Sequence, residues 1–134
     1  MLKVEHIGIA VKSLAVSVPL FEKLLNAECY KTEEIASEGV STAFFRQGET
    51  KIELLEALSP ASPVARFLEK KGEGVHHLAF EVKDIRAEMA RLQNEGFELL
   101  SAEPKPGADN KLVCFLHPKS TNGVLVELTQ ERTE

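Results

Sequence analysis

Gly74-Val75-His76-His77-Leu78-Ala79-Phe80-Glu81-Val82 is an apolar stretch that carries two adjacent histidines. An earlier stretch, Val4-Glu5-His6-Ile7-Gly8-Ile9-Ala10-Val11, repeats its pattern when His6 is aligned with His77. The two stretches share a valine at each corresponding end, and both are apolar enough to predict mostly buried strands. The repetition predicts that the fold contains two related halves.

A second pair of similar segments ends each half. Ile52-Glu53-Leu54 follows the first histidine strand, and Val126-Glu127-Leu128 follows the second at nearly the same spacing. Repeats of this length are duplicated half-domains and not solenoid units. We predict one domain, residues 1–134, made of two modules at about 1–58 and 73–130 that a helical segment connects.

The composition is that of an ordinary globular protein. The chain has 134 residues, of which 43% are hydrophobic and 28% are charged, enough apolar residues for a core. Its apolar runs stay well short of the ~20 residues that a membrane-spanning helix needs. The start of the chain has no signal-peptide pattern, so we expect a cytoplasmic protein. In that reducing compartment Cys29 and Cys114 are expected to be buried free thiols.

The net charge of −5 bears on the kind of partner. Nucleic-acid binding needs a basic surface, so this balance argues against it. An anionic small molecule is compatible with it because local charge can oppose net charge. Lys105, Lys111 and Lys119 are near one another in the sequence and could form a basic patch, or could be three solvated surface lysines. Neither a nucleic acid nor a membrane is expected as a partner.

Periodicity predicts a strand–helix–strand–strand–strand order in each half. In the first half we expect a helix over 14–25 with Ser13 as its N-cap and Asn26 as its stop. Pro19 conflicts with a helix interior because it lacks a backbone donor, which predicts a start nearer Ser17 or a bent first turn. The expected strands of this half are 4–11, 27–34, 40–46 and 51–57.

The second half repeats this order after a connecting helix. Ser62 as N-cap and Pro63 at the first helical position predict that helix, which Gly72 ends. Asp84 is the expected N-cap of a helix over 85–95. The expected strands are 75–82, 97–100, 112–116 and 124–128, with a long loop over 102–111 and a frayed tail at 131–134. These elements predict an α+β fold of two tandem βαβββ modules that form a curved sheet around a metal-binding cleft.

Two histidines and two glutamates that recur in register are candidate metal ligands. Imidazole and carboxylate together suit first-row divalent ions, and a mixed set that leaves coordination positions open is typical of catalytic sites. If the first and last strands of a half lie side by side, His6 can meet Glu53. By the same geometry His77 can meet Glu127 in the second half. The duplication would then gather both pairs around one ion.

A lone histidine on a strand is usually a core or surface residue, so it is the recurrence that favours a metal site. His76 competes with His77 for the role. Side chains alternate between the two faces of a strand, so these two histidines point in opposite directions, and the alignment with His6 selects His77. His117 stands just before Pro118 and is interpreted as a turn or site-rim residue.

The two-module pattern resembles the vicinal oxygen chelate superfamily and, within it, the methylmalonyl-CoA epimerases. The resemblance spans nearly the whole chain, and its last two segments are distinctive of the epimerases. The segments are Glu5–Val11, Thr50–Leu55, Gly74–Ala79, and Phe115–Ser120 running on to Gly123–Leu128. The resemblance implies paired βαβββ units in a cupped sheet, with four metal ligands: His6, Glu53, His77 and Glu127.

Two positions depart from the pattern of some epimerases. The second ligand is glutamine in some of them and Glu53 here, which gives the ligand set of glyoxalase I. Some epimerases also carry a carboxylate that acts as a second base, and alignment on Gly39-Val40 places Thr42 at that position. A threonine hydroxyl cannot serve as a base at neutral pH.

The resemblance implies interconversion of (2R)- and (2S)-methylmalonyl-CoA through an enolate. A divalent ion would stabilise the negative charge that develops as the α-proton leaves. Inversion needs proton exchange on both faces of the enolate, and Glu127 is the first candidate base. Glu53 is the symmetric choice for the opposite face. Glu38, or a water held by Thr42, are the alternatives.

The resemblance also implies a Co²⁺ ion, with Mn²⁺, Ni²⁺, Zn²⁺ or Mg²⁺ as alternatives, an acyl-CoA substrate and a homodimer. The three lysines could meet the phosphates of coenzyme A. One rival function is a glyoxalase I-like lyase that acts on a glutathione hemithioacetal. Iron dioxygenases of the superfamily use two histidines and one glutamate, so a fourth ligand counts against them. A non-catalytic binding protein of the same fold is disfavoured by the intact ligand set.

Overall fold

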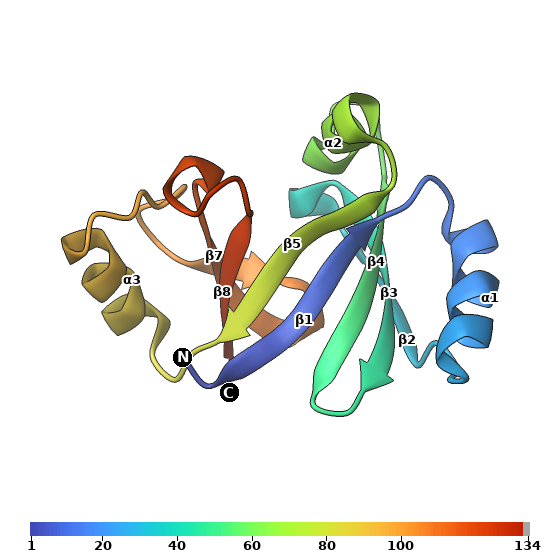
Figure 1. Ribbon diagram of the computed structural model, residues 1–134, viewed down its shortest axis with the longest axis horizontal. Helices are drawn as coiled ribbons and strands as arrows, with labels where there is room; N and C mark the ends of the chain where they lie inside the picture. The colour runs from blue at the N-terminus through green and yellow to red at the C-terminus, as the bar shows by residue number, and fades with distance from the viewer. Residues whose placement is uncertain (133–134) are drawn as a thin grey trace. The chain divides into compact units, whose positions relative to one another are not determined.

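A computed structural model describes residues 1–132 of the chain, which form three α-helices and eight β-strands (Figure 1). The chain divides into two compact units. One unit is residues 6–76, and the other is residues 1–5 together with the chain from His77 onward. Each unit is built around one βαβββ module, so the predicted α+β class and the two tandem modules are confirmed.

The first module is β1 (Lys3–Ala10), α1 (Leu14–Leu25), β2 (Lys31–Ile35), β3 (Val40–Gln47) and β4 (Thr50–Ala57). Its strands lie in the order β2-β3-β4-β1. β4 is antiparallel to β3 and parallel to β1, so the first and last strands of the module are neighbours. A 3₁₀ turn, η1 (Ala36–Glu38), joins β2 to β3.

The second module is β5 (Gly74–Glu81), α3 (Ile85–Asn94), β6 (Lys105–Gly107), β7 (Lys111–Leu116) and β8 (Val126–Glu131). Its strands lie in the order β5-β8-β7-β6, and β8 is again parallel to the first strand of its module. The 3₁₀ turns η2 (Ala108–Asn110) and η3 (Pro118–Ser120) flank β7. The helix α2 (Pro63–Lys71) precedes β5 in the chain. Glu131 ends β8, and residues 133–134 of the predicted frayed tail lie outside the described residues.

The start and stop of α1 follow its capping residues. The Ser13 hydroxyl accepts a hydrogen bond from the backbone N–H of Val16 at 3.3 Å, and Asn26 ends the helix in the left-handed conformation. The helix therefore begins at Leu14, and the expected start nearer Ser17 is wrong. Pro19 is accommodated inside the helix because the packed apolar side chains on its inner face outweigh one missing backbone bond.

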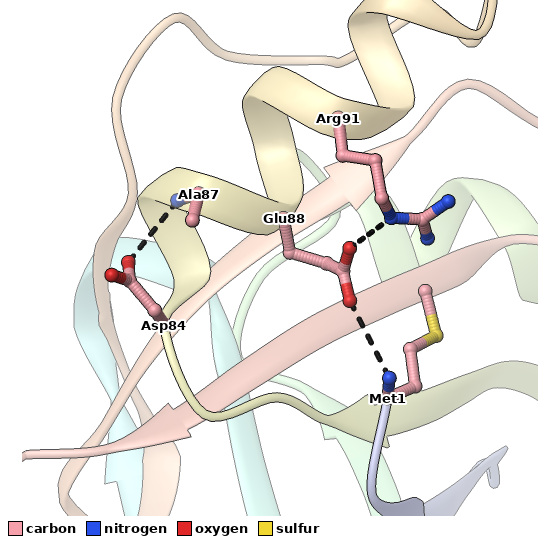
Figure 2. Close-up of polar contacts among 5 residues, drawn as sticks. All are labelled: Met1, Asp84, Ala87, Glu88 and Arg91. Carbon is pink, nitrogen blue, oxygen red and sulfur yellow. Dashed lines mark hydrogen bonds and ion pairs between the residues drawn. The ribbon is translucent and has the colours of Figure 1, made fainter.

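The other two helices begin as predicted. The Ser62 hydroxyl accepts from the backbone N–H of Val64 at 3.1 Å, with Pro63 at the first helical position. The Asp84 carboxylate accepts from the backbone N–H of Ala87 at 3.1 Å, as Figure 2 shows. Each cap satisfies an N–H group that the first turn of a helix leaves without an internal partner.

The first turn of α3 also binds the start of the chain (Figure 2). The Met1 ammonium group lies 3.4 Å from a carboxylate oxygen of Glu88, whose other oxygen accepts a hydrogen bond from Arg91. The hydrogen bond from Arg91 holds the pKa of Glu88 below its ordinary value, and the Met1 ammonium adds to this effect.

Two strand predictions need correction. Residues 97–100 form only an isolated bridge between Leu99 and Leu116, and the second strand of the module is β6, within the predicted loop. The proline of β6 is tolerated because the strand lies at the sheet edge. β2 begins at Lys31 instead of residue 27. The segment before it is bound to helix α1, because the backbone N–H of Cys29 donates a hydrogen bond to the Glu22 carboxylate at 3.0 Å.

Strand alternation separates two faces in each module. One face packs on the module's own long helix, through Val11, Ala43, Phe45 and Leu54 beneath α1 and through Cys114, Leu116 and Leu128 beneath α3. The opposite face carries Phe44 and Glu53 in the first module and Phe115 and Glu127 in the second. The predicted glutamates therefore lie on the sheet faces that α1 and α3 do not cover.

Both cysteines are free thiols, as predicted. Cys114 is buried and Cys29 is half-buried, and burial raises the pKa of the Cys114 thiol. Among the described residues, no helix is both long and apolar enough to cross a membrane.

Candidate metal centre

The first candidate pair, His6 and Glu53, lies on the parallel strands β1 and β4. Gly8 is directly beside Glu53 in the strand register, and His6 is two residues earlier on the same face. The imidazole Nε2 lies 3.1 Å from a carboxylate oxygen of Glu53, and both side chains are buried. Glycine adds no side chain beside the carboxylate, so the diagonal contact is open to the imidazole.

The second pair has the same construction on β5 and β8. Ala79 is directly beside Glu127, and His77 is two residues earlier. His77 Nε2 lies 3.1 Å from a carboxylate oxygen of Glu127, and both side chains are buried. The prediction that the histidine strand and the glutamate strand of each half lie side by side is confirmed.

A phenylalanine faces each glutamate from the next strand. Phe44 is paired with Glu53 across β3 and β4, and Phe115 is paired with Glu127 across β7 and β8. The Phe115 ring is edge-on to His77, with the ring centroids 5.7 Å apart. These two phenylalanines were not singled out in the sequence, although both occupy corresponding positions of the repeat.

The chemistry of the four side chains suits metal binding. Each pair offers an imidazole nitrogen and a carboxylate oxygen, which are ligands for divalent first-row ions. A buried carboxylate also needs a positive or hydrogen-bonding partner, because burying it unpaired is costly. The structure brings His6 to Glu53 and His77 to Glu127. Their roles as metal ligands stay a prediction.

A family model described as the glyoxalase/bleomycin resistance protein/dioxygenase superfamily matches residues 5–115. The chain belongs to this superfamily. The match begins just before the first histidine and covers most of both modules, so the predicted family is confirmed.

Several epimerases of the superfamily are similar to the chain over nearly its whole length. The ethylmalonyl-CoA/methylmalonyl-CoA epimerase of Cereibacter sphaeroides is 44% identical over 130 residues, 96% of this chain and 97% of that protein. The mitochondrial methylmalonyl-CoA epimerase of Homo sapiens is 41% identical over 129 residues, 96% of this chain and 73% of that protein. The structure of Streptomyces coelicolor methylmalonyl-CoA epimerase in complex with 2-nitronate-propionyl-CoA has a TM-score of 0.93 at 33% identity, covering 99% of both chains.

The two other histidines of this superfamily member have separate contacts. The His76 ring is edge-on to Phe67, with the ring centroids 4.9 Å apart. His76 therefore packs on an aromatic ring, whereas the neighbouring His77 contacts Glu127. The His117 Nδ1 atom accepts from the backbone N–H of Lys119 at 3.1 Å and caps the turn η3. The interpretation of His117 as a turn residue is confirmed.

The alternatives for a second base lie on and before β3. Thr42 is fully buried on the same face as Phe44, and its hydroxyl donates to the backbone carbonyl of Glu33 at 3.2 Å. Glu38 lies in the turn η1 and is half-buried. Of the two carboxylates considered for the second base, Glu38 and Glu53, it is Glu53 that lies beside a candidate ligand histidine, His6.

The three lysines do not form one basic patch. Lys111 is only 5% exposed, and its ammonium group lies 3.8 Å from Glu5 and 3.6 Å from Glu131. The interpretation of Lys111 as a solvated surface lysine is therefore wrong. Its side chain lies on the same face of the sheet as Glu127, and a contact with a ligand stays a prediction. Lys119 forms an ion pair with Glu98 at 2.8 Å.

Thr129 was also missed. It lies two residues after Glu127 on the same face of β8 and is 1% exposed. Among the described residues, its hydroxyl oxygen has no hydrogen-bond partner. Period-two alternation from Glu127 was the signal that could have located it beside the pair.

Proposed function

We propose that the chain interconverts the (2R) and (2S) epimers of methylmalonyl-CoA by removing and returning the α-proton. The buried histidine–glutamate pair that recurs in each module carries this proposal. The similarity to epimerases over the whole chain supports the substrate class. A glyoxalase I-like lyase would use the same four ligand types, but these similarities favour the epimerase.

The donor set fits a divalent metal ion. All four side chains are at most 9% exposed, and the two carboxylates among them need a positive charge nearby. We propose that residues 1–134 act as one domain in which a shared cleft holds one ion through His6, Glu53, His77 and Glu127. When bound, the ion supplies positive charge that stabilises the negative charge developing on the substrate.

Glu127 is the proposed base for one face of the substrate. Its carboxylate takes the α-proton, while His77 beside it and Phe115 across from it limit its movement. We expect the α-proton to pass to Glu127 and not directly to water. The thioester and the substrate carboxylate flank this carbon, so proton loss leaves a planar enolate.

Glu53 is the proposed acid for the opposite face. It holds the position in the first module that Glu127 holds in the second, beside a histidine and facing a phenylalanine. The Thr42 hydroxyl hydrogen is already given to the carbonyl of Glu33, which makes Thr42 a poor proton donor. In one turnover Glu127 begins as a carboxylate and takes the α-proton, while Glu53 begins protonated and gives its proton to the opposite face.

The experiment is proton NMR of methylmalonyl-CoA in D₂O with metal-loaded protein. We expect loss of the α-proton signal with loaded protein and a stable signal with metal-stripped protein. Glu127→Gln should slow the exchange, whereas Glu81→Gln should not. Glu81 is a matched control because it is a carboxylate on β5 that pairs with Lys3, at 3.9 Å.

No exchange with Co²⁺, Mn²⁺, Ni²⁺, Zn²⁺ or Mg²⁺ would contradict the epimerase proposal. The same samples would then be given the hemithioacetal of glutathione and methylglyoxal. Isomerisation of that compound would assign the chain to the lyase class.

A further inference from the structure

The hydroxyl group of Thr129 is buried and has no hydrogen-bond partner among residues 1–132. Thr129 is only 1% exposed, so its side chain is shielded from solvent. Most buried polar side-chain atoms in proteins have a partner, because leaving one unsatisfied costs free energy. A hydroxyl that is kept in such a place therefore calls for a role other than stabilising the fold.

Thr129 is a close neighbour of the proposed base. It follows Glu127 by two residues on the same face of β8, a spacing of about 6.6 Å along a strand. A glutamate side chain can cover most of that distance. On the other side of Glu127, the Nε2 atom of His77 lies 3.1 Å from a carboxylate oxygen. Glu127 therefore lies between an imidazole and a hydroxyl on one face of the sheet.

The residues directly beside Thr129 do not bind its hydroxyl. Val113 is paired with it on β7 and has no polar side-chain atom. Glu81 is paired with it on β5, and the Glu81 carboxylate lies 3.9 Å from the Lys3 ammonium group. Glu127 is the neighbour whose hydrogen-bonding capacity changes in the proposed reaction, because protonation gives a carboxylate an O–H donor.

The first module shows that the fold does not require a hydroxyl at this position. Leu55 holds the corresponding place, two residues after Glu53, and packs in an apolar cluster with Ala10 and Val40. An apolar side chain is therefore compatible with the strand and with the glutamate beside it. The hydroxyl distinguishes the surroundings of Glu127 from those of Glu53.

We propose that Thr129 is a positioning residue for Glu127, whose carboxyl group donates a hydrogen bond to the Thr129 oxygen once it has taken the α-proton. This inference rests on the proposed function. In that step the C–H bond of the substrate breaks, an O–H bond forms on Glu127, and the electron pair stays on the substrate as the enolate. Thr129 itself neither gives nor takes a proton.

The contact favours proton removal because it is made only as the proton moves. An interaction that is equally strong before and during the step does not accelerate it, whereas one that appears during the step does. In the structure the Glu127 carboxylate contacts His77, and the Thr129 hydroxyl has no hydrogen-bond partner among the described residues. When the proton arrives, the new O–H group and the hydroxyl oxygen satisfy each other.

The kinetic test compares Thr129→Val with Thr129→Ser in metal-loaded protein. Thr129→Val removes the hydroxyl with little change in shape and should lower kcat for α-proton exchange about tenfold, the effect of one hydrogen bond. KM for methylmalonyl-CoA should be unchanged, and Thr129→Ser should restore kcat. The affinity of metal-free protein for Co²⁺ should also be unchanged, because Thr129 is not a proposed ligand. Thr32→Val, at an exposed position of β2, is the matched control.

A double-mutant cycle tests the contact without catalysis. Glu127→Gln carries an amide N–H donor where the protonated carboxyl group carries O–H, so it imitates the protonated state. In metal-free protein, Thr129→Val should raise the midpoint of thermal unfolding by roughly 2–5 °C in the wild-type background and lower it by a similar amount in the Glu127→Gln background. Thr32→Val should give the same shift in both backgrounds.

Four results would each overturn the proposal. They are equal shifts for Thr129→Val in both backgrounds, a raised KM with kcat intact, a weaker affinity for Co²⁺, and a serine variant as slow as the valine variant. If the wild-type chain fails to exchange the α-proton but the shift changes sign between the backgrounds, the contact between the two side chains stands and the epimerase proposal alone is rejected.

Discussion

The histidine–glutamate pairs of the two modules match closely: His6 with Glu53 and His77 with Glu127 both have Nε2–oxygen distances of 3.1 Å. In each module the two residues lie on parallel neighbouring strands, with a small residue beside the glutamate and a phenylalanine facing it. The duplication therefore repeats the pair of candidate ligands and also the residues that hold it.

The surroundings of the pairs differ. The residue two positions after the glutamate is Leu55 in the first module and Thr129 in the second. Aligning the two phenylalanines places Val40, packed in an apolar cluster, opposite Lys111, which forms a buried ion pair. The histidine–glutamate distance is therefore the same in both modules, while the residues around each pair differ in polarity. For this reason the two glutamates need not perform the same step.

The largest expected effect separates the two glutamates. Glu127→Gln should slow α-proton exchange from one epimer by about 10²–10⁴-fold, because an amide cannot accept that proton. Glu53→Gln should leave that exchange largely intact but block inversion, because the proton can no longer return on the opposite face. Proton NMR in D₂O measures the exchange, and a chiral assay of recovered substrate measures inversion. Equal loss of both reactions in both variants would show that the carboxylates act as one unit.

The second prediction concerns the difference between Val40 in the first module and Lys111 in the second, and it replaces Lys111 by an apolar side chain. Lys111→Met removes the ammonium partner of Glu5, which is only 3% exposed, and should lower the free energy of unfolding by about 3–5 kcal/mol. The corresponding change in the first module, Val40→Met, enlarges a side chain in a packed cluster and should cost about 1–3 kcal/mol. Urea unfolding at neutral pH measures both.

A double variant checks the cause of that loss. Adding Glu5→Gln to Lys111→Met removes the buried negative charge and should recover part of the stability. Additive losses in the double variant would contradict the ion-pair explanation and indicate a packing defect instead.

Thr129 allows a smaller test in the opposite direction. Its hydroxyl is buried with no hydrogen-bond partner among residues 1–132, so Thr129→Val keeps the shape and removes a polar atom. We expect a gain of about 1 kcal/mol in the free energy of unfolding of metal-free protein. Thermal unfolding measures it. A loss of stability would mean that the hydroxyl binds a partner, such as an ordered water.

The smallest expected effect depends on pH and concerns the first turn of α3 and the chain start that it binds. The pKa of Glu88 in the folded chain lies below its ordinary value of 4.5, so its interactions stabilise the fold above that value and are lost as the pH falls through the folded pKa. Glu88→Gln should cost less than about 1 kcal/mol at pH 7, and the difference from wild type should vanish in stronger acid. A difference that persists at pH 2–3 would rule out the carboxylate charge as its source.

Much of the ligand arrangement could be predicted from the sequence because it is repeated. Two histidine strands and two glutamate strands at similar spacing were enough to predict that His6 lies beside Glu53 and His77 beside Glu127. Alternation also separated His76 from His77. Capping rules correctly predicted where the three helices begin, because an N-cap acts on backbone groups only a few residues away. The N-caps are Ser13, Ser62 and Asp84.

The errors came from strand pairings and contacts that the pattern of a single segment does not show. β6 is formed by pairing with β7, so a loop-like sequence with a proline became an edge strand. Lys111 was read as a surface residue because its partner Glu5 is at the other end of the sequence. The phenylalanines and Thr129 acquire significance only when the strand register is known.

The parallel pairing of β1 with β4 and of β5 with β8 has a consequence for folding. Each pairing closes a long loop, whose entropy cost must be met before the strands gain their contacts. The helix and the two intervening strands of a module should therefore order first, and its two candidate ligands should meet last. During synthesis the first pair can close once β4 has left the ribosome, whereas the second must wait for β8. The proposed set of four ligands is therefore complete only after β8 has been made.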